Sequence, residues 1–109
     1  MAKCSYSLRY LPMFYNDMED HIMYISDVLC NVDAANDLID AVERAILERL
    51  PNAESFEPYH SMKERKYPYY RIYVKNYTIY YVVIPEGEGQ KIMEVRRIVH
   101  NLQERGQYI

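Results

Sequence analysis

Apolar residues change their spacing along the chain, and these changes divide it into predicted strands and helices. Positions 6–10 alternate tyrosine or leucine with polar residues, which predicts a short first strand with one buried face, stopped by Pro12. From Phe14 onward the apolar residues recur at helical spacing, which predicts a first helix that ends near Asn31. The stripe of that helix consists of Met18, Ile22, Ile25 and Leu29.

A second helical pattern follows after only a few residues. Asp33 is a favourable N-cap, and Pro51 ends the pattern because the residue before a proline avoids helical geometry. Two helices with so short a connection are expected to form an antiparallel hairpin. Their apolar faces need a partner, which only a sheet built from the remaining strands can supply. The second stripe consists of Leu38 or Ile39, Val42, Ile46 and Leu50.

The last third of the chain predicts three strands. Residues 69–75 alternate in character, residues 77–84 are apolar on both faces, and residues 91–100 alternate again. Asn76 and the segment 85–89 supply the turns between them. Because the middle strand is apolar throughout, we expect it at the centre of the sheet.

Together these elements predict one α+β domain over residues 1–109, in the order β-α-α-β-β-β. The helical hairpin should pack on one face of a mostly antiparallel sheet. The chain has no secretory segment at its start and no apolar run near 18 residues, so we expect a cytoplasmic protein outside the membrane. Cys4 and Cys30 lack the spacing of a disulfide framework or a zinc site, and we expect neither a metal nor a cofactor.

Charge is divided unevenly along the chain. The net charge of −3 argues against a dedicated nucleic-acid binder. Residues 1–59 carry four basic and eleven acidic side chains, a balance of −7, whereas residues 60–100 carry eight basic and four acidic, a balance of +4. One surface of the molecule is therefore suited to phosphate and another repels it. A solvated charge pattern without a function explains the division equally well.

Strand parity predicts where the candidate polar side chains lie. Arg71 falls on the face of its strand that excludes the apolar residues, and Arg96 and His100 share one face of the last strand. We therefore expect these three side chains together on the side of the sheet away from the helices. Parity separates Arg97 from His100, and only a β-bulge near Ile98 would bring those two to one face.

Short motifs mark the ends of the predicted elements. They are Tyr6 to Pro12 before a helix that carries Asp17, Ala34-Ala35 at the start of the second helix, Tyr70-Arg71-Ile72, Asn76-Tyr77 with Tyr80-Tyr81, and Arg97-Ile98-Val99-His100. In this order and spacing they resemble the RelE/ParE superfamily of toxins from bacterial type II toxin–antitoxin modules. The resemblance covers almost the whole chain.

The resemblance implies a small toxin held inactive by a cognate antitoxin protein, with one of two targets. RelE-like members cleave mRNA on the ribosome, whereas ParE-like members poison DNA gyrase without being enzymes. The preferred interpretation is a ribosome-dependent mRNA endonuclease, which needs an acid, a base and cations around the phosphate. His100 suits the acid or base, Arg71 and Arg96 suit phosphate binding, and Glu57, which precedes Pro58, resembles a candidate base of some ribonuclease members.

Each of these assignments has a structural alternative. His100 can equally be a hydrogen-bonding residue at a strand end, Arg71 can cover neighbouring tyrosines with its methylene stem, and Glu57 can be an ordinary loop carboxylate. Residues 52–66 show no sustained period and are predicted to be a long loop, of a kind that is often functional. Candidate RNA contacts, or else solvated charges, are Lys63, Arg65 and Lys66 in this loop and Arg97 on the last strand.

Two departures from the ribonuclease pattern keep the second target open. Thr78 stands where ribonuclease members usually carry an arginine, and Asn101-Leu102-Gln103 replace a segment that is often basic. With these cations missing, the alternatives are a ParE-like gyrase poison and an attenuated relative that only binds its antitoxin.

Overall fold

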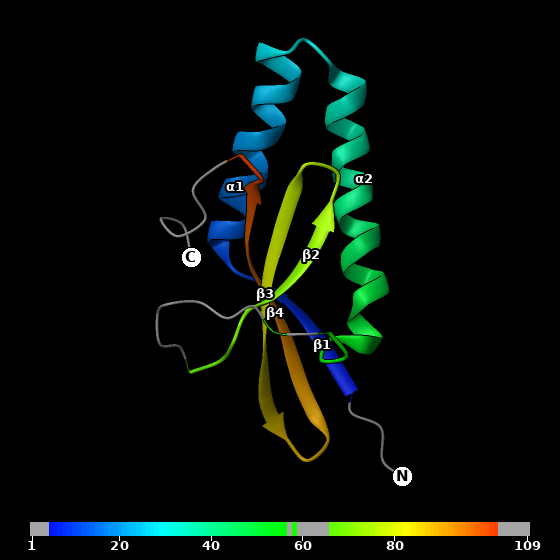
Figure 1. Cartoon of the computed structure of the whole chain (residues 1–109), viewed down its shortest axis with the longest axis vertical. Helices are drawn as coiled ribbons and strands as arrows, with labels where there is room; N and C mark the ends of the chain where they lie inside the picture. Colours follow the sequence, from blue (N-terminus) through cyan, green and yellow to red (C-terminus); the bar gives the residue numbers. More distant parts are fainter. Residues whose placement is uncertain (1–4, 57, 59–65, 103–109) are drawn as a thin grey trace.

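A computed structural model describes residues 5–56, 58 and 66–102 and confirms the α+β fold (Figure 1). In the described residues two helices pack on a four-stranded sheet with strand order β1-β4-β3-β2. Strand β1 runs parallel to β4, and the other neighbours are antiparallel. The elements are β1 (Ser5–Tyr10), α1 (Pro12–Met23), the π-helix η1 (Tyr24–Val28), α2 (Val32–Arg49), the 3-10 helix η2 (Leu50–Asn52), β2 (Tyr70–Val74), β3 (Tyr77–Gly87) and β4 (Gln90–His100).

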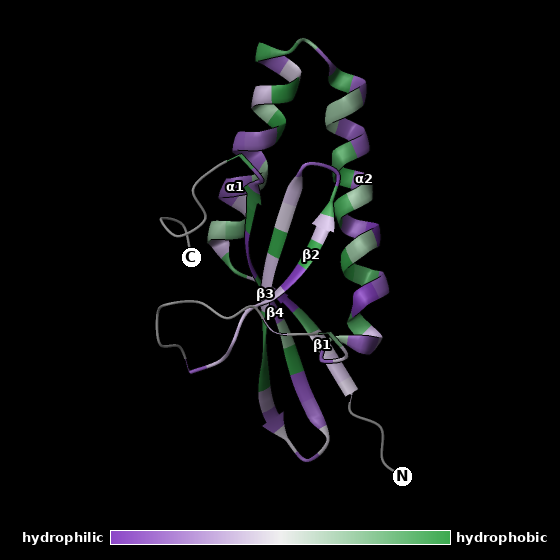
Figure 2. Cartoon of the chain, in the orientation of Figure 1, coloured by the Kyte–Doolittle hydropathy of each residue, from purple (hydrophilic) through white to green (hydrophobic). Residues whose placement is uncertain are grey.

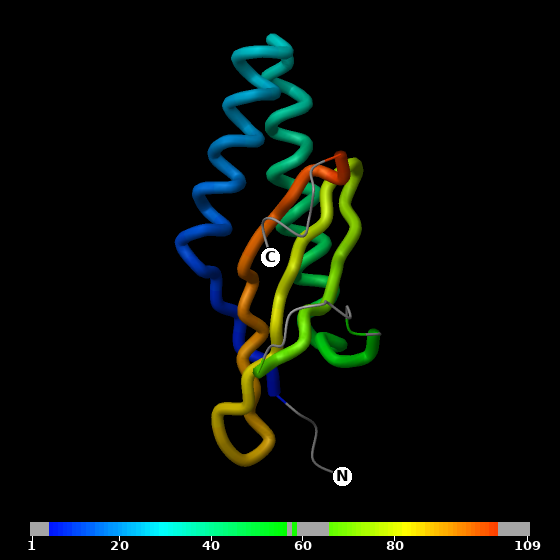
Figure 3. Tube along the Cα trace, turned by 60° about the vertical axis from the view of Figure 1, so that its left-hand side comes forward, coloured from blue at the N-terminus to red at the C-terminus, as the bar shows by residue number. Residues whose placement is uncertain are grey.

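The helices cover one face of the sheet, and the main core lies between these two layers (Figure 3). Apolar and polar residues alternate along both helices, as Figure 2 shows, and the apolar side faces the sheet. The apolar strand β3 lies inside the sheet, as predicted. Its core partners in α2 are the buried Leu38, Val42 and Ile46.

The ends of the helices differ in part from the prediction. The first helix begins at Pro12, where a missing N–H has no consequence, and continues as a π-helix from Tyr24 to Val28. Asn31, rather than the predicted Asp33, is the N-cap of α2, and its Oδ1 accepts a hydrogen bond from the backbone N–H of Ala34 at 3.0 Å. Asp33 lies within the first turn, where its negative charge interacts favourably with the helix dipole.

A set of polar contacts fastens the end of α2 to the sheet. The buried hydroxyl of Tyr81 donates to the carbonyl of Ala53 at 2.6 Å. The Nη1 of Arg49 donates both to that hydroxyl and to the carbonyl of Arg71, each at 3.0 Å. Burial raises the pKa of Tyr81, so the hydroxyl stays protonated and keeps donating.

The helical hairpin extends beyond the end of the sheet that carries the β2–β3 turn (Figures 1 and 3). Large apolar side chains are exposed near this end, among them Tyr24, Val28, Leu29 and Val32.

Among the described helices, none has the length and apolar character needed to cross a bilayer.

The α2–sheet contact should dominate the stability of the fold. Ile46 is 0% exposed, so Ile46→Ala leaves a cavity and should lower the free energy of unfolding by about 2–5 kcal/mol. Ile39→Ala, on an exposed position of the same helix, should change it by about 0.5 kcal/mol or less. Urea denaturation of both variants measures the difference, and equal effects would contradict this description of the core.

Candidate functional site

Strand β4 contains a β-bulge in its second half. Tyr81 pairs with Val95, whereas the neighbouring Tyr80 pairs with Arg97, so Arg96 is an extra residue in the ladder. An extra residue reverses the alternation of side chains beyond it. The two halves of β4 therefore point their odd-numbered residues to opposite faces.

The burial pattern follows this reversal. Before the bulge, Met93 packs in the main core and Glu94 lies on the opposite face of the sheet. After the bulge, Ile98 lies in the main core, and His100 pairs with Tyr77, which is also a main-core residue. We call the side away from the helices the far face. It carries a smaller apolar cluster of Tyr69, Tyr80, Val82 and Val99.

The predicted grouping of Arg71, Arg96 and His100 on one face is wrong. Arg71 pairs with Tyr80 and lies on the far face, whereas His100 lies on the helix side. The bulge is the reason, because it shifts the parity of every residue between Arg96 and the strand end. Because the bulge precedes both Arg97 and His100, it leaves their relative parity unchanged; the two residues line one groove because the guanidinium of Arg97 pairs with Asp17 of α1.

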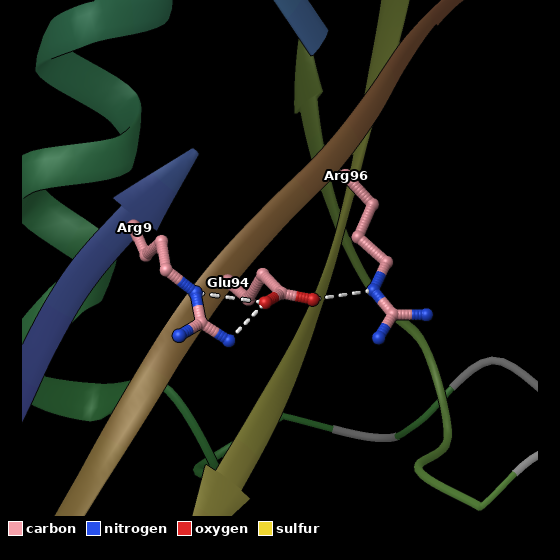
Figure 4. Close-up of polar contacts among 3 residues, drawn as sticks. All are labelled: Arg9, Glu94 and Arg96. Atoms are coloured by element: carbon pink, nitrogen blue, oxygen red, sulfur yellow. Dashed lines mark hydrogen bonds and ion pairs between the residues drawn. The ribbon is translucent and has the colours of Figure 1, made fainter. Parts of the chain in front are cut away.

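On the far face, Glu94 is held between two arginines from different strands (Figure 4). Its Oε2 accepts hydrogen bonds from Nε of Arg9 at 2.8 Å and from Nη2 of the same residue. Its Oε1 accepts one from Nε of Arg96 at 2.8 Å. The parallel pairing of β1 with β4 creates this site, since it sets Arg9 directly beside Glu94.

Burial and hydrogen bonding act in opposite directions on the Glu94 carboxyl. The residue is 4% exposed, and burial alone would raise its pKa. The hydrogen bonds and charges of Arg9 and Arg96 outweigh burial and lower the pKa below its usual value of 4.5. Burial likewise works against the charge of Arg96, but Glu94 and Tyr69 raise its pKa overall. The site is thus ionised at neutral pH.

A second buried carboxylate binds the other arginine of β4. Asp17 of α1 accepts hydrogen bonds from Nε and Nη2 of Arg97 at 2.7 and 2.8 Å, a bidentate pair. Its Oδ2 also accepts from the backbone N–H of Ile98 at 3.1 Å, on a stretch of β4 that extends beyond its pairing with β1. Arg97, predicted to contact RNA, therefore joins α1 to the sheet.

A groove of about 890 Å³ lies between the helical hairpin and the end of the sheet. We call it the tip groove. Its apolar lining includes Tyr24, Leu29, Leu38 and Leu102. Acidic groups are added by Asp20 and Asp37, and basic groups by Lys75 and by Arg97, which is paired with Asp17.

His100 lies in the tip groove beside a second histidine. The ring of Tyr77 contacts both imidazoles, with its centroid 4.7 Å from that of His21 and 5.0 Å from that of His100. The Nε2 of His21 is 2.9 Å from the carbonyl of Ile98, and Nδ1 of His100 accepts from the backbone N–H of Leu102 at 3.2 Å. The contact of His21 therefore joins α1 to β4, whereas that of His100 stays within the end of β4.

The remaining predicted site residues lie in or before β2. The guanidinium of Arg71 lies 5.7 Å from the ring centroid of Tyr73, and Lys66 lies 5.5 Å from that of Tyr67. Arg71 is therefore a far-face residue next to tyrosines, as the sequence suggested. Glu57, Lys63 and Arg65 lie outside the described residues.

Sequence reasoning missed two residues that organise the far face, Arg9 and Glu94. A glutamate among the apolar residues of β4 signals a buried charge that needs a cation, and this signal was available. The identity of the partner was not, because it depends on which strand lies beside β4. Across the described residues, no three His, Cys, Asp or Glu side chains gather as metal ligands.

Replacing Glu94 should make stability less dependent on acid pH. Because the folded state lowers its pKa, Glu94 stabilises the fold above about pH 4.5, and this contribution is lost as pH falls through the lowered value. Glu94→Gln should lower the free energy of unfolding by about 1.5–3 kcal/mol at neutral pH, with the difference shrinking toward pH 3. Urea denaturation from pH 7 to pH 3 measures this. Glu86→Gln, at an exposed position of β3, is the control, and a pH-independent difference would contradict the assignment.

Comparison with known families agrees with this architecture. The family model described as the ParE toxin of the type II toxin–antitoxin system, parDE, matches residues 8–105 of the 109. A search of curated proteins found no match. The matched region contains both helices and strands β2 to β4. The chain therefore belongs to the ParE toxin family of type II toxin–antitoxin systems.

Proposed function

We propose that this toxin acts by binding and poisoning DNA gyrase, and that its cognate antitoxin neutralises it by occupying the tip groove. Membership of a toxin–antitoxin family implies the antitoxin as a partner. Gyrase as the target, in the cytoplasm, is our inference. It is preferred over ribosome-dependent cleavage of mRNA because of where the candidate catalytic residues lie.

The separation of Arg71 from His100 carries the proposal. Cleavage of RNA by its own 2′-hydroxyl requires an acid, a base and a phosphate-binding cation within reach of one phosphate. Arg71 lies on the far face and His100 in the tip groove, with the sheet between them. One phosphate cannot contact both. Inhibition of a target by binding alone does not need these groups to lie around one phosphate.

The charges of the arginines on β4 give further support. Arg97 is paired with Asp17, and Arg96 shares Glu94 with Arg9. A cation that is already paired with a carboxylate stabilises an additional negative charge less than an unpaired cation does. Position 78 holds threonine instead of arginine, which fits the same conclusion. The hydroxyl of Thr78 donates to Oδ1 of Asn101 at 2.6 Å.

The tip groove suits an amphipathic helix of the antitoxin. Its apolar lining provides room for side chains at helical spacing, and exposed Val28 and Val32 extend the apolar surface. Asp20 and Asp37 line the same groove, so Lys or Arg beside the apolar anchors would complement it. We therefore propose an antitoxin segment with an apolar stripe and basic flanks as the occupant.

The choice of target can be tested with the purified toxin. It should inhibit supercoiling of plasmid DNA by gyrase and accumulate cleaved DNA, and His100→Ala should retain this effect. In cells, induction of the toxin without antitoxin should arrest growth without new 5′ ends within translated mRNA. Gel assays of supercoiling and mapping of transcript ends provide the two measurements.

The opposite result identifies the alternative functions. In-frame cleavage of ribosome-bound mRNA, lost in both Arg71→Ala and His100→Ala, would replace gyrase poisoning with endonuclease activity. Normal growth at high expression without antitoxin would instead indicate a family member that only binds its partner.

The antitoxin site can be tested with two matched leucines. Leu29 is exposed in the tip groove, whereas Leu47 is exposed on α2 outside it. Leu29→Asp should weaken antitoxin binding at least about tenfold, because a buried leucine contributes about 1.5–3 kcal/mol. Leu47→Asp should leave the affinity unchanged. Calorimetry with the antitoxin encoded beside the toxin measures both, and equal affinities would exclude the tip groove.

A further inference from the structure

We infer that Lys75, in the turn between β2 and β3, selects the antitoxin by pairing with one of its acidic side chains. The inference deepens the proposed function and rests on it, because it concerns a partner that occupies the tip groove. It adds one requirement to the apolar and basic segment proposed above, namely a carboxylate at the position that faces the end of the sheet. A segment whose charged residues were all basic would place a like charge against Lys75.

The charged side chains that line the tip groove are only partly compensated within the toxin. Asp17 and Arg97 pair with each other. Among the described residues, no side chain forms an ion pair or a hydrogen bond with the carboxylates of Asp20 and Asp37 or with the ammonium of Lys75. All three of these residues are exposed. A partner in the groove therefore meets two negative charges and one positive charge that it can pair with its own side chains.

The two signs of charge lie on different walls of the groove. Asp20 belongs to α1 and Asp37 to α2, whereas Lys75 belongs to the turn between β2 and β3. The helical hairpin extends past this turn (Figures 1 and 3), so a segment in the groove has one side toward the helices and another toward the sheet end. Basic side chains of the partner should face the helices and an acidic one the turn, because like charges opposed across an interface disfavour binding.

The backbone at position 75 does not favour a lysine. Val74 pairs with Tyr77, so Lys75 and Asn76 form a two-residue turn. Lys75 has a φ of 53°, in the left-handed region that residues with a Cβ adopt at an energetic cost. Two-residue hairpin turns mostly place glycine, asparagine or aspartate at such a position. The turn between β3 and β4 follows this preference, with Gly89 at a φ of 66°.

The unfavourable conformation of Lys75 is a reason to look for a role of its side chain in binding. Glycine would suit the turn better but would remove the ammonium group from the groove. The long, flexible stem of lysine allows the ammonium to reach a carboxylate of a partner that lies over the turn. The uncompensated charge and the positive φ are separate observations, and both point to the same side chain.

The affinity for the antitoxin encoded beside the toxin, measured by calorimetry at two salt concentrations, tests the inference. Lys75→Gln should weaken binding about two- to fivefold at low salt, the range expected for an exposed ion pair. The loss should shrink at about 0.5 M salt, which screens the charges. Lys66→Gln removes the same charge at an exposed position outside the groove and should leave the affinity unchanged.

The sign of the effect decides between two kinds of partner. Asp37→Asn should weaken binding for any basic segment. Lys75→Gln weakens it further only if an acidic side chain faces the turn, and strengthens it if a basic one does. Stronger or unchanged binding by Lys75→Gln would therefore overturn the inference.

A second variant separates a role in binding from a role in the fold. Lys75→Gly is compatible with the positive φ, so it should keep or raise the urea concentration at the midpoint of unfolding while it weakens binding as much as Lys75→Gln does. A lower midpoint would contradict the argument from the turn. Lys75→Glu should weaken binding most, and exchange of one acidic residue of the antitoxin for lysine should restore it. If no such exchange restores binding, the proposed pairing is wrong.

The leucine variant of the groove keeps this test separate from that of the proposed function. If Leu29→Asp leaves the affinity unchanged, the antitoxin binds elsewhere, and the proposed site and this inference fail together. If Leu29→Asp weakens binding whereas Lys75→Gln does not, the antitoxin occupies the tip groove, and the selection by Lys75 alone is refuted.

Discussion

Arg96 is an extra residue in β4, and this β-bulge determines how the polar side chains of this toxin are divided between the two faces of the sheet. Side chains in a strand alternate with a period of two, so one inserted residue exchanges the faces of all those that follow. Without the bulge, His100 would join Arg71 on the far face. With it, His100 turns to the helices and lines the tip groove.

Two buried carboxylates make this arrangement stable. Glu94 binds arginines of β1 and β4 on the far face, and Asp17 binds the next arginine of β4 from α1. Each carboxylate would be destabilising alone, and each arginine makes its burial tolerable. The Glu94 pairs join β1 to β4, and the Asp17 pair joins α1 to β4. These polar groups therefore also support the fold.

The result is a small protein with two chemically different surfaces. The tip groove is mostly apolar, with Asp20, Asp37 and Lys75 at its edge, whereas the far face combines an aromatic cluster with Glu94 and its two arginines. In our proposal the antitoxin occupies the tip groove.

The sequence by itself determined the elements, the fold class and the family, because these follow from local periodicity and short motifs. It also identified Arg71 correctly as a far-face residue. It misplaced His100 and missed the roles of Arg9 and Glu94. These depend on the β-bulge and on the parallel pairing of β1 with β4, which joins residues 85 positions apart. Only the tertiary structure decided them, because strand register is set by contacts between distant segments and leaves no periodic signal in either one.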